Sequence, residues 1–134
     1  MMEYSKRLRS YGIRITPQRL AVYAMLMEMG HSSVEEMVAA LCQIHPNVTV
    51  STVYNVLDCF ARHGLINRLS TPQGKLFYDV NTTTHHHIVT SCGTLIDYDA
   101  PQLTAMINDF FDKNPISGHT INSVSLQLYE KPFF

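Results

Sequence analysis

The sequence predicts an α+β protein in which an N-terminal winged helix-turn-helix precedes a small C-terminal α/β dimerisation domain. Three segments with the apolar spacing of helices, followed by two short apolar segments around a turn sequence, predict the first part. A β-α-β pattern predicts the second part. In this chain of 134 residues we expect the first domain over 1–80, a polar hinge over 81–84, and the dimerisation domain over 85–134.

The first two expected helices have recognisable N-terminal signals. Thr16-Pro17 places an N-cap hydroxyl before a proline at the first helical position, and Gly30 ends the apolar pattern that follows. Ser32 and Ser33 each lie three residues before a glutamate, so a capping box is available in either register. A short amphipathic helix is therefore expected to follow these serines, and His45-Pro46-Asn47 ends it.

The third expected helix begins near Ser51 or Thr52, and Gly64 is a favourable C-terminal stop. One face of this helix is apolar and the other carries polar or flat side chains, so we expect only the first face to be buried. The residues at helical spacing on the buried face are Val53, Val56, Leu57 and Phe60.

Short apolar segments predict strands on both sides of the hinge. Thr71-Pro72-Gln73-Gly74 is a turn sequence between two of them, as in the wing of a winged helix. Beyond the hinge, Pro101 opens a further helix between strands. The expected strands run over 65–69, 76–80, 85–90, 94–98 and 123–129.

Composition and charge restrict the class of protein. The hydrophobic share of 46% is normal for a globular protein, and no apolar segment is long enough to cross a bilayer, so we expect a cytoplasmic protein without membrane contacts. A C-terminal unit of about 50 residues is too small to be very stable alone, which predicts a homodimer. The net charge of −1 combines a basic start with an acidic second half, as suits a nucleic-acid-binding half joined to a different one.

The third helix carries the side chains that a recognition helix needs. Hydroxyls bond phosphates, a tyrosine ring packs on a thymine methyl, and an asparagine reads adenine. A dimer of such units would read a palindromic operator in double-stranded DNA. The alternative is that the hydroxyls only cap the helix and that the tyrosine is half-buried. The expected DNA-binding residues are Arg14, Gln18, Arg19, Ser51, Thr52, Tyr54 and Asn55.

Two histidines at alternate positions give the sharpest indication of chemistry. His85 and His87 begin an expected strand, so their side chains share a face about 7 Å apart at the Cα atoms and could chelate one ion. His86 would point away. Asp79 and Asp97 are carboxylates within otherwise apolar strand segments, where a charge is costly unless it meets a cation or hydrogen-bond donors.

A further histidine, His31, follows Gly30 in an expected loop between two helices. With the other two histidines and the two aspartates it makes an N3O2 ligand set suited to Fe²⁺, Mn²⁺ or Zn²⁺, without the thiolates of a closed zinc site. Each member also has a structural explanation as a surface, cap or turn residue. An ion shared across the hinge would fix the angle between the domains, so that its occupancy would select the spacing of the DNA half-sites.

The three cysteines predict neither a disulfide framework nor a zinc site built from cysteines alone. They are widely separated and contain no Cys-x-x-Cys pair. Cys42 and Cys59 fall within helical patterns, and we expect both to be core residues.

Seven short motifs follow one another over nearly the whole chain. They are Gly12-Ile-Arg-Ile-Thr-Pro-Gln-Arg19, His31-Ser-Ser-Val-Glu-Glu36, Val50-Ser-Thr-Val-Tyr-Asn55, Gly64-Leu65, Phe77-Tyr-Asp79, His85-His-His87 and Cys92-Gly93. Because it carries these motifs in this order, the chain resembles the ferric uptake regulator (Fur) family of bacterial metal-responsive repressors. The resemblance implies a homodimer with an N-terminal winged helix, and one regulatory divalent metal ion per subunit. The implied ligands are His31, Asp79, His85, His87 and Asp97.

At Asp79 and Asp97 the iron sensors of the family usually have glutamate. With aspartate at both positions, the chain resembles the peroxide-sensing branch. The resemblance then implies that Fe²⁺ reacts with peroxide and that a ligand histidine, His31 or His85, is oxidised. Mn²⁺ would bind without this reactivity, and Zn²⁺ could occupy the site in the purified protein. We therefore expect a metal-dependent, peroxide-responsive transcriptional repressor.

The chain departs from the family in its cysteines. Members commonly hold a structural zinc with two Cys-x-x-Cys pairs, but here the first is reduced to Thr90-Ser91-Cys92 and the second is missing. We expect no structural zinc, so apolar packing must hold the dimer together. The candidates for this packing are Phe110, Phe111, Phe133 and Phe134.

Three other interpretations stay open. An iron, manganese or zinc uptake regulator of the same family would bind DNA without sensing peroxide. His85, His87 and Asp97 also resemble the facial triad of non-haem iron oxygenases. Those enzymes sit on larger β-barrels with a substrate cavity that this chain cannot enclose, so we expect no enzymatic activity. The third interpretation is a winged-helix regulator that does not depend on metal.

Overall fold

The structure is a computed structural model that describes residues 2–132. Phe133 and Phe134, two of the expected dimer contacts, therefore lie outside the described residues. The chain divides into two compact units, Met1–Thr82 and Thr83–Phe134. This division falls inside the segment 81–84 that the sequence suggests as a hinge, and hinge motion there stays a prediction.

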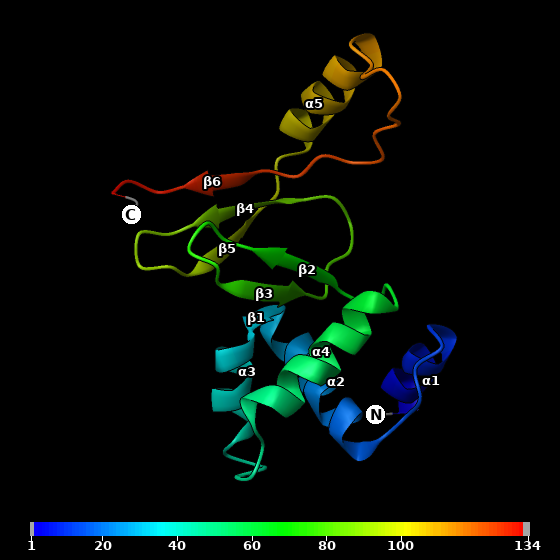
Figure 1. The fold of residues 1–134 in the computed structure, drawn as a ribbon, viewed down its shortest axis with the longest axis vertical. Coiled ribbons are helices and arrows are strands. Elements are labelled where there is room, and N and C mark those ends of the chain that lie inside the picture. The colour runs from blue at the N-terminus through cyan, green and yellow to red at the C-terminus, as the bar shows by residue number, and fades with distance from the viewer. Residues whose placement is uncertain (1, 133–134) are drawn as a thin grey trace. The chain divides into compact units, whose positions relative to one another are not determined.

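Four helices and a three-stranded sheet form the described part of the N-terminal unit (Figure 1). Strand β3 lies in the middle of the sheet and pairs antiparallel with β1 on one side and β2 on the other. The helix α1 and the strand β1 are additional to the elements expected from the sequence. The elements are α1 Met2–Ser10, α2 Pro17–Met29, β1 His31–Ser33, α3 Val34–Leu41, α4 Val50–Arg62, β2 Asn67–Ser70 and β3 Leu76–Asp79.

Side-chain caps explain where α2 and α3 begin. The Thr16 hydroxyl accepts a hydrogen bond from the backbone N–H of Arg19 at 3.1 Å, and Pro17 follows it as the first helical residue. At α3 the capping box uses the second of the two available registers. The Ser33 hydroxyl accepts from the Glu36 N–H at 3.1 Å, and the Glu36 carboxylate accepts from the Ser33 N–H at 3.0 Å.

Helix α4 begins slightly earlier than the sequence suggests. Its N-cap is Thr49, whose hydroxyl accepts from the Thr52 N–H at 3.2 Å. The expected start near Ser51 or Thr52 is one or two residues late, because three hydroxyl residues occur close together here and any of them satisfies the local requirement for a cap. The consequence is that Ser51 and Thr52 lie in the first turn of the helix, where a recognition helix presents its contacts.

The buried face of α4 packs into the core of the N-terminal unit. Val53, Leu57 and Phe60 are fully buried, and the Phe60 ring lies edge-on to Tyr23 of α2 with their centroids 5.8 Å apart. Tyr78 of the central strand β3 belongs to the same cluster, and burial raises its pKa to about 12. Because this face is fixed against α2 and the sheet, the opposite face of α4 stays open to solvent.

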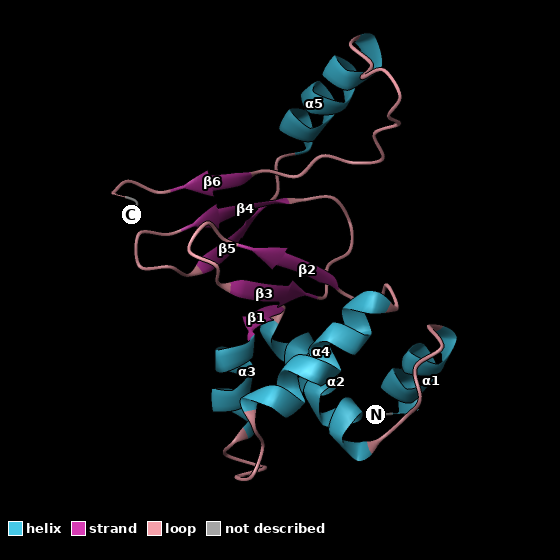
Figure 2. Ribbon diagram, in the orientation of Figure 1, coloured by secondary structure: helices cyan, strands magenta, loops and turns pink. Residues whose placement is uncertain are grey.

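Three strands and one helix form the described part of the C-terminal unit (Figure 2). Strand β4 lies in the middle, antiparallel to β5 and parallel to β6. Helix α5 lies in the connection between β5 and β6, in the expected order of strand, helix and strand. The elements are β4 His86–Val89, β5 Leu95–Tyr98, α5 Pro101–Lys113 and β6 Gln127–Tyr129.

The last strand is shorter than the expected 123–129. It begins only at Gln127, because the N–H of the preceding Leu126 donates to a side chain, the Nδ1 of His86 at 3.0 Å. The Leu126 carbonyl still accepts from the His87 N–H at 3.0 Å. The register of β6 is therefore set partly by a histidine side chain of the neighbouring strand.

Apolar side chains remain exposed on the C-terminal unit. No residue of α5 is buried, and Met106 and Phe110 on this helix are 69% and 57% exposed. Ile96 of β5 and Leu128 of β6 are also exposed. An apolar surface of this kind on so small a unit supports the expected pairing of two copies. None of the described helices combines the length and the apolar character that a membrane span requires.

Candidate metal and nucleic-acid sites

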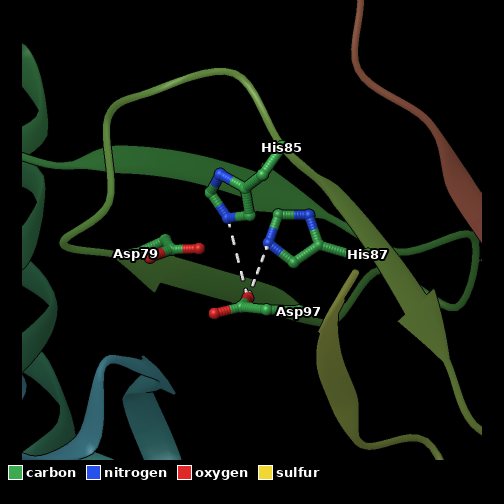
Figure 3. Close-up of side chains that lie close together, drawn as sticks. All are labelled: Asp79, His85, His87 and Asp97. Atoms are coloured by element: carbon green, nitrogen blue, oxygen red, sulfur yellow. Dashed lines mark ion pairs between the residues drawn. The ribbon is translucent and has the colours of Figure 1, made fainter. Parts of the chain in front are cut away.

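The C-terminal unit brings three of the expected metal ligands together (Figure 3). His87 lies in β4 directly opposite Asp97 of the antiparallel strand β5. His85 immediately precedes β4, so alternation along the extended chain turns it toward the same face as His87. The ligand atoms of these three residues lie within 4.8 Å of one another.

The nitrogen atoms of the two imidazoles face one carboxylate oxygen. The Nε2 atom of His87 lies 3.2 Å from the Asp97 Oδ1, and the Nε2 of His85 lies 3.6 Å from the same atom. The Nδ1 of His85 is 2.7 Å from the carbonyl oxygen of Thr83. Because a carbonyl only accepts hydrogen bonds, this Nδ1 carries a proton, and in the neutral imidazole the lone pair of His85 is then on the Nε2 that faces Asp97.

These separations are close to those that coordination of a single divalent ion requires. With metal–ligand distances of about 2.1 Å, neighbouring ligand atoms lie roughly 3.0–3.4 Å apart in octahedral or tetrahedral geometry. The two histidines are only 7% and 5% exposed, whereas the Asp97 side chain is 48% exposed. The candidate ligands are thus shielded on the histidine side, and an aspartate on the solvent side would leave a path for an ion to enter.

The N-terminal unit carries the other two expected ligands on adjacent strands. His31 opens β1, and its backbone lies opposite Asp79, the last residue of β3, which is also labelled in Figure 3. His31 was expected in a loop; it lies instead in a short strand, because residues 31–33 pair with β3. Asp79 is 1% exposed and accepts a hydrogen bond from the Asn81 N–H at 2.9 Å.

Each unit therefore contains a histidine and an aspartate as a cross-strand pair. In an antiparallel sheet such directly opposite residues have Cβ atoms about 4.5–5.5 Å apart, close enough for both side chains to reach one ion. The pair is His31 with Asp79 in the first unit, and His87 with Asp97 in the second. That all five residues bind the same ion stays a prediction.

A groove in the N-terminal unit joins the start of α2 to the start of α4. It has a volume of about 320 Å³ and is lined by five of the seven expected DNA-binding residues, together with Thr16 and Val56. The Arg19 guanidinium donates to the Arg14 carbonyl at 2.8 Å, which holds the side chain beside the groove. The five residues are Arg14, Gln18, Arg19, Thr52 and Asn55.

The other two expected DNA-binding residues, Ser51 and Tyr54, are exposed on α4 and do not line this groove. Tyr54 is 37% exposed, so the alternative of a half-buried tyrosine describes its environment nearly as well. Its ring nevertheless stands on the polar side of the helix with Asn55. The face of α4 that is open to solvent therefore carries hydroxyl, amide and aromatic groups. These are the kinds of group that contact DNA in recognition helices.

Sequence reasoning missed the ion pairs that join the wing to α4. Asp58 of α4 binds the Arg68 guanidinium of β2 at 3.1 Å and the Arg62 Nε at 3.2 Å. The pair with Arg62 has helical i, i+4 spacing and could have been predicted from the sequence. The pair with Arg68 depends on how the wing folds back on the helix, so no local signal indicates it.

The cysteines differ from expectation at one position. Cys59 is buried as expected, but Cys42 is exposed because it lies at the C-terminal cap of α3 rather than on its apolar face. Cys92 is exposed in the turn between β4 and β5, where hydrogen bonds from the hydroxyls of Thr90 and Thr94 hold its pKa below the usual range. The absence of a structural zinc stays a prediction.

Comparison with known proteins assigns most of the chain to one family model. The model of the ferric uptake regulator family matches residues 10–129. The chain is 39% identical to the peroxide-responsive repressor PerR of Staphylococcus aureus over 98 residues, which cover 72% of this chain and 66% of that protein. It is 38% identical to the PerR of Staphylococcus epidermidis, with 72% and 65% covered. The chain thus spans slightly less than two thirds of the length of these relatives.

Solved structures show the same fold. The ferric uptake regulator (Fur) of Vibrio cholerae superposes with a TM-score of 0.81 at 26% identity, covering 94% of this chain and 97% of the other. The ferric uptake regulator of Pseudomonas aeruginosa with manganese has a TM-score of 0.76 at 27% identity, with 96% of each chain covered. These likenesses confirm the α+β class and the order of a helical N-terminal part before a small α/β part.

Proposed function

This chain belongs to the ferric uptake regulator family, and we propose that it is a metal-dependent, peroxide-responsive DNA-binding repressor. One observation carries the proposal. Two imidazole nitrogens and a carboxylate oxygen converge in the C-terminal unit at separations suited to one divalent ion. The groove of the N-terminal unit supplies the nucleic-acid surface that such a regulator needs.

The proposed ion binds five side chains, one ion per subunit. His85, His87 and Asp97 are preorganised in the C-terminal unit, and the cross-strand pair of His31 and Asp79 completes the set from the N-terminal unit. Three imidazoles and two carboxylates suit Fe²⁺ or Mn²⁺ in function, and Zn²⁺ binds the same ligands in the purified protein. A bound ion supplies positive charge to these carboxylates, and Fe²⁺ additionally supplies an electron to peroxide.

Metal occupancy acts on DNA binding through the link between the two units. Because each unit contributes ligands, shared coordination restricts how the units move about residues 81–84 and selects arrangements that fit both half-sites of a palindrome. We propose a homodimer in the cytoplasm, paired through the exposed apolar surface of the C-terminal unit. Regulation rather than catalytic turnover is the proposed role, as in the family.

Peroxide responsiveness rests on the aspartates and on the names of the relatives. Both carboxylates of the proposed site belong to aspartates. The Staphylococcus proteins, with which most of this chain aligns, are named peroxide-responsive repressors. In the net reaction, hydrogen peroxide transfers one oxygen atom to a C–H group of His31 or His85 and leaves as water. The alternative is an iron, manganese or zinc uptake regulator without this oxidation.

We expect Mn²⁺ to increase the DNA affinity of the full chain by about 5- to 150-fold, the usual range of coupling between two ligands. The probe is a duplex selected from a random-sequence pool by the Mn²⁺-loaded protein. Fluorescence anisotropy compares its binding by the protein with Mn²⁺ and after removal of metal by a chelator. Equal affinity in both states would favour a regulator that does not depend on metal.

The groove residues should divide into those that read bases and those that bind phosphates. Replacing Asn55 with alanine should cost about 1–3 kcal/mol of binding to the selected duplex and weaken its sequence preference. Arg19→Ala should weaken binding to all duplexes by the same factor. It should also lower the magnitude of the slope of log affinity against log salt concentration by about 1 for each phosphate that the arginine neutralises. Lys113→Ala, which removes an exposed charge from the other unit, is the control for net charge. Unchanged affinity in both groove variants would place the DNA-binding surface elsewhere.

A further inference from the structure

His86, between the two histidine ligands, makes a fixed set of hydrogen bonds on the opposite side of β4. Its side chain is fully buried. The Nε2 atom lies 2.9 Å from the hydroxyl of Thr104 in α5, and the Nδ1 atom accepts from the Leu126 N–H at 3.0 Å. One imidazole thus connects β4 to the helix α5 and to the segment that leads into β6.

The partners of His86 determine which ring nitrogen carries the proton. A backbone N–H only donates, so the Nδ1 that receives the Leu126 bond has a lone pair and the proton is on Nε2. The Nε2–H therefore donates to the Thr104 hydroxyl. That hydroxyl in turn donates to the Ala100 carbonyl at 3.2 Å. The two hydrogen bonds therefore point in the same direction, from the imidazole to the hydroxyl and from the hydroxyl to the carbonyl. A chain of this kind fixes the ring rather than permitting several orientations.

We propose that His86 is a positioning residue for the metal site, and that the Thr104 hydroxyl is the partner through which it acts. Side chains along a strand alternate between faces, so a ring held on one face determines where its two neighbours point on the other. Holding His86 against α5 directs His85 and His87 toward Asp97. The inference rests on the proposed function, because it assigns His86 a role in the same metal site.

A second consequence follows from the location of the partners. Thr104 lies in the first turns of α5, and Leu126 precedes β6, so both ends of the α5 connection are bonded to the strand that carries the ligands. The metal ligands and the helix with the exposed apolar surface are therefore joined by hydrogen bonds within one unit. Weakening the Thr104 bond should loosen the ligands without removing any of them.

The test replaces Thr104 with valine, which has the same shape without the hydroxyl, and with serine, which keeps the hydroxyl. Isothermal titration of the metal-free full chain with Mn²⁺ gives the affinity, and the d–d absorption of bound Co²⁺ reports the ligand geometry. We expect Thr104→Val to weaken Mn²⁺ binding about tenfold, as is common when a group that orients a ligand is removed, and to alter the Co²⁺ spectrum. The Thr104→Ser variant, which keeps the hydroxyl, should have a Mn²⁺ affinity and a Co²⁺ spectrum close to those of the wild type.

Thermal unfolding of the metal-free variants separates positioning from stability. A purely structural role would lower the midpoint of Thr104→Val but leave its Mn²⁺ affinity and Co²⁺ spectrum as in the wild type, which would overturn the inference. If Thr104→Val does not fold, Thr104→Ala removes the same hydroxyl with less bulk and is judged in the same way. A wild-type chain that binds no Mn²⁺, or a His87→Ala variant that binds it equally well, would overturn the proposed function and this inference with it.

Discussion

Replacing His87 with alanine is expected to weaken Mn²⁺ binding by more than about 100-fold, and with it to remove the increase in DNA affinity that the metal causes. Loss of a group that merely orients a ligand costs about 10- to 100-fold, so loss of the ligand itself should cost more. His87 is the best-placed of the histidines, directly opposite Asp97 in the sheet and 3.2 Å from its carboxylate. Isothermal titration and anisotropy with the selected duplex measure the two effects.

A control variant tests whether the loss of any histidine from the C-terminal unit affects metal and DNA binding. His119→Ala makes the same substitution at an exposed position of the C-terminal unit and should bind Mn²⁺ and DNA as the wild type does. Without metal, His87→Ala and the wild type should bind DNA equally weakly, because the groove of the N-terminal unit is unchanged. If His87→Ala still responds to Mn²⁺, the metal site lies elsewhere and the proposed mechanism is wrong.

The helices could be predicted wherever a cap lies next to its helix in the sequence. Thr16-Pro17 determines the start of α2 by hydrogen bonds within one turn, so its position was accessible. Helix α1 was missed because only one of its residues, Leu8, is buried in the core, which gives no apolar period. Strand β1 was missed because it is three residues long and exists only by pairing with β3, a distant part of the chain.

The candidate metal site shows the same division between local and distant information. Alternation along a strand was enough to place His85 and His87 on one face. Their convergence on Asp97 depends on the register between β4 and β5, which spacing along the chain does not determine. The role of His86 was beyond sequence reasoning altogether, because Thr104 and Leu126 reach it from separate parts of the fold.

Hydrogen peroxide is expected to abolish DNA binding by the Fe²⁺-loaded protein while leaving the Mn²⁺-loaded protein active. The physical reason is that Fe²⁺ held by the proposed ligands would supply electrons to peroxide, whereas Mn²⁺ would not, and His31 or His85 would be the group that takes up the oxygen atom. An oxidised ligand binds the ion weakly, so the effect on DNA affinity should equal that of removing the metal. The two loaded forms, prepared without oxygen, are compared by anisotropy before and after peroxide.

The exposed histidines of the chain provide an internal control for this prediction. Mass spectrometry of the treated protein should find one added oxygen atom on the peptide with His31 or on the peptide with His85, and fragmentation should assign it to the ligand rather than to His86. His45 and His119 are exposed, whereas His85 is only 7% exposed, so oxidation that was not directed by the metal would reach those two histidines before His85. If DNA binding is abolished without histidine oxidation, the chain senses the metal itself, because peroxide has then only removed Fe²⁺ by converting it to Fe³⁺.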